Sequence, residues 1–225
     1  MMPLKIAILA SGVGSNAQAI IDKINAGVLD AEISIIVSNK PDAPVLEKAR
    51  MAGLPHDIVN NRAFPDRSSF DHALVDVVAK AGCDYVVLAG YMLLLTPYFL
   101  NSFSGNVINI HPALLPAFPG TAGAKSALEY GVKISGPSVH FVEEQVDSGP
   151  LIIQGAVPVI AGEPLANLQK RIHEMEHRIY PQAIQWLAEG RISRQGRTVL
   201  LADSPKKKVV PQDNWLVWPP LEEGF

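Results

Sequence analysis

Apolar runs that alternate with amphipathic segments fill the first half of this chain, and this alternation constrains its fold more than any other feature. The run at residues 4–10 (LKIAILA) is almost entirely apolar, which is typical of a strand buried on both faces of a sheet. Further strands are expected at residues 33–38, 54–59, 84–89 and 106–110. Helices are expected between them at residues 17–27, 44–52 and 69–81, the last capped by Asp66 or Ser69. Strands that alternate with helices predict parallel β-α-β units, and therefore an α/β fold with an open, doubly wound, mostly parallel sheet.

The pattern changes in the second half of the chain. Two β-rich stretches, residues 137–142 and 151–160, flank a polar segment and are expected to form an antiparallel strand pair. A short helix is expected near residues 123–130, and a long one at residues 164–189, whose apolar residues recur every three or four positions. Pro181 should kink the long helix, because proline removes a backbone hydrogen bond from a helix interior. An antiparallel C-terminal pair is therefore expected to follow the parallel part of the sheet.

The tail of the chain differs from the rest in composition. From about residue 191 it carries a KKK run at residues 206–208 and four prolines, which suggests a loosely packed surface extension. We see no internal repeat and no linker before it. The sequence therefore predicts one domain over residues 1–195, followed by a C-terminal extension over residues 196–225.

Charge and hydropathy exclude several kinds of partner. The 225 residues include 19 Lys and Arg against 22 Asp and Glu, a formal net charge of −3, so the chain lacks the basic surface that nucleic acid requires. The longest apolar run, residues 85–95, falls short of the roughly 20 residues that span a bilayer. The run at residues 6–10 is too short for a signal-peptide core, and Cys83 has no second cysteine to pair with. We expect a cytoplasmic protein that acts on small molecules, as a monomer or weak homodimer, with no nucleic-acid or membrane partner.

A glycine-rich loop lies between the first predicted strand and helix. Residues 12–17 (GVGSNA) match the dinucleotide fingerprint G-x-G-x-x-A, in which backbone N–H groups at a helix start bind an anion. The fingerprint also needs an acidic residue at the end of the second strand, where this chain has VSNK at residues 37–40. Ser15 and Asn16 are short polar side chains suited to one terminal phosphate. The loop therefore favours a monophosphate, and a tight turn without a ligand is the alternative.

A second polar group sits at the end of a predicted strand. Asn109 and His111 are two residues apart, so their side chains should leave the same face of the strand. The carboxyl edge of a parallel sheet is where open α/β folds bind ligands, and an amide with an imidazole could hold the oxyanion of a tetrahedral intermediate. Asp147 could orient the imidazole and raise its pKa. Ordinary hydrogen bonding at a strand end and a simple turn are the alternatives.

Three motifs in this half of the chain resemble the folate-dependent formyltransferases. They are NIHPALLP at residues 109–116, SVHFV at residues 138–142 and DSGPLIIQ at residues 147–154. The resemblance reaches to about residue 195 and implies a Rossmann-like formyltransferase fold, with 10-formyltetrahydrofolate as the formyl donor and no metal ion. The loop Gly14-Ser15-Asn16 resembles the branch that formylates the amine of N1-(5-phosphoribosyl)glycinamide in purine (IMP) synthesis.

The resemblance also implies a role for individual residues. The catalytic residues would be Asn109, His111 and Asp147, with a cationic His111. The residues expected to bind the ribonucleotide are Gly14, Ser15, Asn16, His173 and Glu176. The residues expected to bind the formyl donor are Arg67, Met92, Leu93, Leu94, Leu95 and Asn109. The stretch from Met92 to Leu95 also fits the apolar start of a helix, and Leu93 stands where some relatives carry Arg.

Three other functions remain open at this point. The run His173-Glu174-Met175-Glu176-His177 matches both H-E-x-x-H and H-x-x-E-H, so a zinc hydrolase is possible, although no third ligand is obvious. The glycine loop alone would also fit a non-catalytic nucleotide-binding module. Within the formyltransferase superfamily, a formyltetrahydrofolate hydrolase is the nearest alternative.

Overall fold

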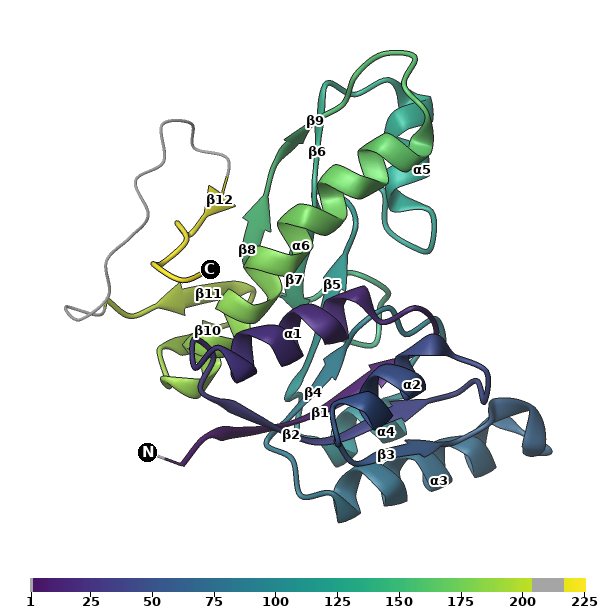
Figure 1. Ribbon diagram of the computed structural model, residues 1–225. Coiled ribbons are helices and arrows are strands. Elements are labelled where there is room, and N and C mark those ends of the chain that lie inside the picture. Colours follow the sequence, from purple (N-terminus) through teal and green to yellow (C-terminus); the bar gives the residue numbers. More distant parts are fainter. Residues whose placement is uncertain (1, 204–216) are drawn as a thin grey trace.

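The computed structural model describes residues 2–203 and 217–225 and is built around one central sheet (Figure 1). The strands of this sheet are β1 (Leu4–Ala10), β2 (Ala31–Ser38), β3 (His56–Ile58), β4 (Tyr85–Leu88), β5 (Val107–His111), β7 (Ser138–Phe141), β8 (Leu151–Gly155) and β12 (Val217–Trp218). Their order across the sheet is β12-β8-β7-β5-β4-β1-β2-β3. The five strands from β3 to β5 in this order run parallel, and β7, β8 and β12 continue the sheet antiparallel. The predicted fold class is confirmed.

Helices cover both faces of the sheet. They are α1 (Ser15–Asn25), α2 (Pro44–Met51), α3 (Arg67–Lys80), α4 (Pro97–Ser102), α5 (Gly123–Tyr130) and α6 (Leu165–Ala188), with a 3-10 turn η1 at Asn61–Ala63. In β1, Ile6 and Ile8 face a core formed with α1, α2 and α6, whereas Ala7 and Leu9 face a core formed with α3 and α4. Side chains alternate between the faces of a strand, so a strand buried on both faces must be apolar throughout.

The starts of the helices can be compared with the predicted boundaries. Helix α3 begins after Asp66, whose side chain accepts a hydrogen bond from the Ser69 N–H at 2.7 Å. Of the two residues predicted as possible caps, Asp66 is therefore the one that caps the helix. Helix α1 begins at Ser15, two residues earlier than expected. Helix α6 continues through Pro181, and the kink expected there stays a prediction.

Two predictions about elements are wrong. The stretch from Met92 to Leu95 is a loop rather than the start of a helix, because α4 begins at Pro97 after a cap by the Thr96 hydroxyl. The expected strand at residues 151–160 is divided. Its second part, β9 (Val157–Pro158), leaves the central sheet and pairs with β6 (Ile134–Ser135) next to α5 and α6 (Figure 1).

The C-terminal residues pack more closely than the sequence suggested. After the hairpin of β10 (Ile192–Gln195) and β11 (Thr198–Leu201), β12 pairs with β8, and Leu221 is 1% exposed in the core. The expectation of a loosely packed tail is therefore wrong for residues 217–225, because β12 covers a sheet edge that would otherwise stay unpaired. The KKK run at residues 206–208 lies outside the described residues. The division at residue 195 stays a prediction.

In the described part of the chain, no helix combines the length and the hydropathy that a membrane span requires.

Candidate active site

The end of β5 and the strand beside it bring together the polar residues that the sequence singled out. Antiparallel pairing of β5 with β7 places Asn109 opposite His140 and His111 opposite Ser138. Asp147 lies in the connection between β7 and β8 with a φ of 51°, a left-handed conformation that is uncommon for residues other than glycine. All of these residues lie at the carboxyl end of the parallel strands, the edge where open α/β sheets bind ligands.

Asp147 joins the group. Its Oδ2 lies 3.2 Å from Nδ1 of His111, and its Oδ1 lies 3.5 Å from Nε2 of His140. The same His140 nitrogen lies 3.3 Å from Nδ2 of Asn109. Asp147 also accepts a hydrogen bond from the Gly120 N–H at 2.7 Å. The structure thus brings Asn109, His111 and Asp147 into one network. These three residues and His140 are referred to below as the polar cluster.

His140 is a residue of this cluster that the sequence analysis did not assign. It lies within the motif at residues 138–142, and its side chain is almost fully buried. The signal that could have found it is the antiparallel strand order, because β7 must lie beside β5 and place one of its side chains opposite Asn109. The motif alone does not indicate this pairing, because 31 residues of sequence separate His140 from Asn109.

The cluster shifts the ionisation of its members. Burial acts to raise the pKa of Asp147, but the hydrogen bonds from His140 and Gly120 and the proximity of His111 outweigh it and lower that pKa. Burial lowers the pKa of His111, and Asp147 and the Phe118 carbonyl oppose this only in part. Asp147 acts to raise the pKa of His111, as predicted, but the net shift is downward because the loss of hydration outweighs the attraction of the carboxylate.

His111 is held from both sides. Its Nδ1 faces Asp147, and its Nε2 lies 2.8 Å from the carbonyl oxygen of Phe118. A neutral imidazole carries one N–H and can donate to only one of these two oxygens. Gly123 permits the close approach of this ring, because a Cβ at that position would lie 2.9 Å from Nε2.

A cavity adjoins the polar cluster on one side, and it is referred to below as the slot. It is lined by Leu88, Tyr91, Leu93, Leu94, Leu95, Asn109, His140, Val142, Glu143, Glu144, Val146 and Asp147. Of the residues expected to bind the formyl donor, Leu93, Leu94, Leu95 and Asn109 therefore line it. Met92 is 56% exposed and outside the lining, and Arg67 reaches the wall of the slot by donating to the Leu94 carbonyl oxygen.

A second cavity, referred to below as the hollow, lies near His111, because Gly123 in its lining is next to the ring of that residue. It is lined by Pro112, Thr121, Ala122, Gly123, Ala124, Lys125, Leu165, Gln169, Ile172 and His173. Pro112, one of these lining residues, directly follows His111 of the polar cluster in the sequence. His173 was expected to face the ribonucleotide, and the structure places it in the wall of the hollow.

The glycine loop is tied to α6. Gly14 adopts a φ of 72° directly before α1, and a Cβ there would lie 2.5 Å from the side chain of Val45 in α2, so only glycine fits. Asn16 donates from Nδ2 to the Glu176 carboxylate at 2.8 Å, while its buried Oδ1 has no hydrogen-bond partner. Burial raises the pKa of Glu176 to about 7, against the opposing effect of the hydrogen bond from Asn16. An unpartnered acceptor beside a buried acid is suited to a ligand with hydroxyl groups.

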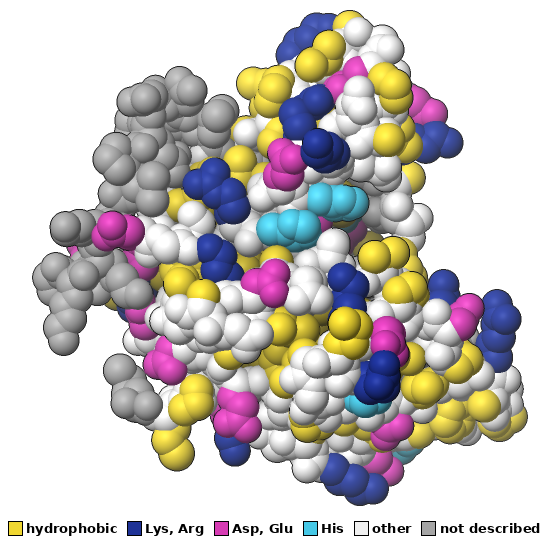
Figure 2. Space-filling model, in the orientation of Figure 1, with side chains coloured by type: hydrophobic (Ala, Val, Ile, Leu, Met, Phe, Trp, Pro, Cys, Tyr) yellow, Lys and Arg dark blue, Asp and Glu magenta, His cyan; other side chains and the backbone are white. Residues whose placement is uncertain are grey.

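Histidine side chains gather on the face of the molecule where α6 lies against α1 (Figure 2). The rings of His173 and His177 are 6.5 Å apart and nearly parallel. Within the residues that the structure describes, no group of three or more His, Cys, Asp or Glu side chains is placed to hold a metal ion. The H-E-x-x-H run therefore lacks a third ligand there.

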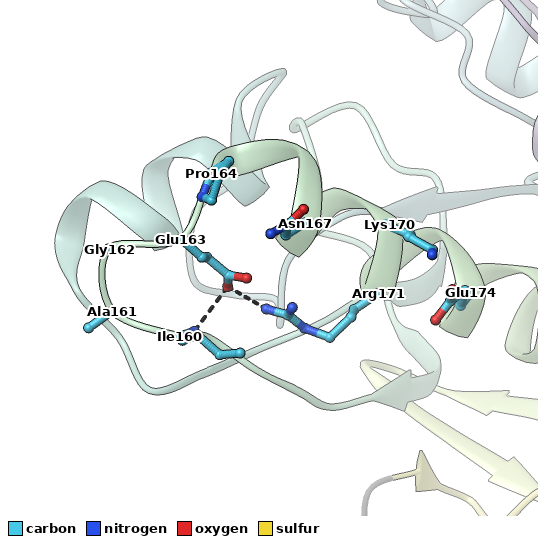
Figure 3. Close-up of a pocket in the computed structure, with 9 residues that line it drawn as sticks. All are labelled: Ile160, Ala161, Gly162, Glu163, Pro164, Asn167, Lys170, Arg171 and Glu174. Atoms are coloured by element: carbon cyan, nitrogen blue, oxygen red, sulfur yellow. Dashed lines mark hydrogen bonds and ion pairs between the residues drawn. The ribbon is translucent and has the colours of Figure 1, made fainter.

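A third cavity, distinct from the slot and the hollow, opens at the start of α6 (Figure 3). Glu163 forms an ion pair with Arg171 and accepts a hydrogen bond from the Ile160 N–H at 3.0 Å, which closes the loop before the helix. None of the residues that line it belongs to the polar cluster, the slot or the glycine loop.

An amide, two histidines and a carboxylate beside a cavity form a site suited to acyl-group transfer. The formyl transferase family matches residues 4–184, and the chain belongs to this family. It is 42% identical over 189 residues to the phosphoribosylglycinamide formyltransferase of Escherichia coli, covering 84% of this chain and 89% of that protein. The structure of glycinamide ribonucleotide transformylase 1 from Symbiobacterium toebii matches with a TM-score of 0.88 and 44% identity, over 90% of this chain and 95% of that one.

Larger proteins carry the same domain. The human trifunctional purine biosynthetic protein adenosine-3 is 42% identical over 188 residues, which are 84% of this chain and only 19% of that protein. The chain thus spans only about a fifth of the length of this human relative.

Proposed function

We propose that this protein transfers the formyl group of 10-formyltetrahydrofolate to the amine of N1-(5-phosphoribosyl)glycinamide. The products are the formylated glycinamide ribonucleotide and tetrahydrofolate, a step of de novo purine synthesis. The observation that carries the proposal is the position of Asn109, His140 and Asp147 of the polar cluster in the wall of the slot. The names of the relatives support the choice of acceptor.

The glycine loop and α6 are proposed to bind the ribonucleotide. The backbone N–H groups of Gly14, Ser15 and Asn16 at the start of α1 suit a phosphate, because they are unpaired donors at the positive end of the helix dipole. The Asn16 Oδ1 and the Glu176 carboxylate would accept hydrogen bonds from the ribose hydroxyls. His173 would contact the same ligand from the hollow.

The slot is proposed to bind the formyl donor. Leu93, Leu94 and Leu95 supply an apolar wall against which a pterin ring can pack. Asn109 lies in the lining together with Asp147, so a formyl group in the slot would lie next to the cluster. Met92, at the rim, and Arg67, beside the wall, would contact the rest of the donor.

Direct transfer follows from these positions. The acceptor amine attacks the formyl carbon, a C–N bond forms, and the carbonyl oxygen becomes an oxyanion that the Asn109 amide holds. We propose that His111 carries protons on both ring nitrogens at this stage, because the negative charge of the oxyanion favours the imidazolium. Nδ1 then still faces Asp147, and Nε2, once released by the Phe118 carbonyl, donates to the oxyanion. When the intermediate collapses, the bond from the formyl carbon to the folate nitrogen breaks, and the proton lost by the amine passes to that nitrogen through a water held by Asp147.

A folate-release assay tests this function. We expect release of tetrahydrofolate, followed spectroscopically, only when N1-(5-phosphoribosyl)glycinamide is present. Release of tetrahydrofolate and formate without the acceptor would contradict the proposal and support a formyltetrahydrofolate hydrolase. Binding of the ribonucleotide with no release in either case would support a non-catalytic module.

We further propose that small molecules are the only partners of this protein, which acts in the cytoplasm as a monomer or weak homodimer. The net charge of −3 supports the absence of a nucleic-acid partner.

A further inference from the structure

Arg67 connects the start of α3 to the wall of the slot. Its Nε lies 2.9 Å from Oδ1 of Asp71, one turn further along the helix, in an ion pair that lacks hydrogen-bond geometry. A second nitrogen of the same guanidinium donates to the carbonyl oxygen of Leu94. The guanidinium also lies over the ring of Phe70, 5.0 Å from its centroid. Three contacts therefore fix one side chain, and one of them reaches the loop that lines the slot.

The burial of the two charges is unequal. The Asp71 side chain is 2% exposed, whereas the Arg67 side chain is 38% exposed. A buried carboxylate is stable only when it is paired, and in the described part of the chain Arg67 is the cation paired with Asp71. The planar guanidinium can serve a carboxylate and a carbonyl at the same time, which a lysine ammonium does with much less geometric control.

The charges around the slot are mainly acidic. The residues that line the slot include three acids, Glu143, Glu144 and Asp147, and no Lys or Arg. Arg67 lies just outside the lining, and its guanidinium supports the wall of the slot by donating to the Leu94 carbonyl oxygen.

We infer that Asp71 is a positioning residue for formyl-donor binding: it fixes Arg67, and through Arg67 the Leu93–Leu95 wall of the slot. The inference rests on the proposed function, because it assumes that the slot binds the donor. Without the charge of Asp71, the guanidinium is free to turn to solvent, and the Leu94 carbonyl loses its donor. The wall then becomes less ordered, and the donor must order it on binding.

The test compares Asp71→Asn with Asp76→Asn, a matched change at an exposed position of the same helix. For D71N we expect the KM for 10-formyltetrahydrofolate to rise about tenfold, the loss typical of a charge-assisted contact. The KM for the ribonucleotide and kcat should stay within about twofold of wild type, and D76N should change neither KM. A loss of folding stability alone would not separate the two KM values in this way.

A double variant makes the assignment specific. If Asp71 acts through Arg67, the donor KM of the double variant R67A/D71N should equal that of Arg67→Ala, because the second change has nothing left to release. Fully additive effects in the double variant, or a D71N donor KM equal to that of D76N, would overturn the inference. A wild-type protein that releases no tetrahydrofolate with both substrates would instead contradict the proposed function.

Discussion

Asp147 contacts two histidines at once, and its ionised form is what allows this. Its lowered pKa means that it accepts hydrogen bonds at neutral pH and can hold a water that passes on a proton. We expect Asp147→Asn to lower kcat by about 100-fold or more, the range typical of a lost proton-transfer group, with little change in the KM for the ribonucleotide. Steady-state kinetics with both substrates would measure this. Asp57→Asn, an exposed change on β3, is the control, and a D147N rate within a few-fold of wild type would contradict the role of Asp147.

Glu176 makes the stability of the protein depend on pH. Its pKa is raised by burial from 4.5 to about 7, so between these values the folded protein binds more protons than the unfolded chain. The free energy of unfolding therefore falls as the pH rises through this window, by up to about 3 kcal/mol. Glu176→Gln keeps the volume of the side chain and cannot ionise, so this fall should be absent.

Urea denaturation between about pH 4.5 and pH 8 would measure the difference between wild type and E176Q. The exposed neighbour Glu174→Gln is the control, since it lies on the same helix outside the buried face. Curves of unfolding free energy against pH that run parallel for wild type and E176Q would show that burial of Glu176 does not shift its pKa.

At the scale of elements, the connection from β1 to α1 depends on the backbone of one residue. Gly14 combines a φ of 72° with a position where a Cβ would meet Val45 at 2.5 Å, whereas Gly27 has a φ of 67° and open space around it. Gly14→Ala should therefore reduce the free energy of unfolding by about 2 kcal/mol or more, because alanine disfavours this φ and its Cβ would clash with Val45. Gly27→Ala should reduce it by only about 1 kcal/mol, because only the φ is unfavourable there. Because the loop is proposed to hold the phosphate, the KM for the ribonucleotide should rise in G14A alone. Equal unfolding free energies for the two variants would contradict the predicted clash.

At the scale of the whole molecule, the end of the chain completes the core. Leu221 is 1% exposed and packs in the same core as α1 and α6, whereas Leu200 on the hairpin is 42% exposed. We expect Leu221→Ala to reduce the free energy of unfolding by about 2–4 kcal/mol and Leu200→Ala by less than about 0.5 kcal/mol. Denaturant titration of the full chain would measure both. A Leu221→Ala protein as stable as wild type would show that residues 217–225 do not contribute to folding.

Local sequence signals predicted the architecture but not the packing of its end. The alternation of apolar runs and amphipathic segments predicted the parallel sheet, because burial on both faces requires apolar residues at every position of a strand such as β1. The tail was expected to be loose from its prolines and its KKK run. Its apolar residues Val217, Leu221 and Phe225 instead pack against the edge and core of the sheet. Amino-acid composition alone does not predict such contacts, because they depend on the position of distant elements.

What the sequence determined by itself is the fold class and the convergence of Asn109 and His111 on one side of a strand, because periodicity and strand geometry are local. The family was indicated by the resemblance of three short motifs. What only the tertiary structure decided is which distant side chains meet and how they ionise. His140 joins the polar cluster through strand pairing, Arg67 contacts both Asp71 and the Leu94 backbone, and burial lowers the pKa of His111 although Asp147 acts to raise it. Each of these depends on burial by elements far away along the chain, and burial is a property of the folded molecule rather than of any segment of its sequence.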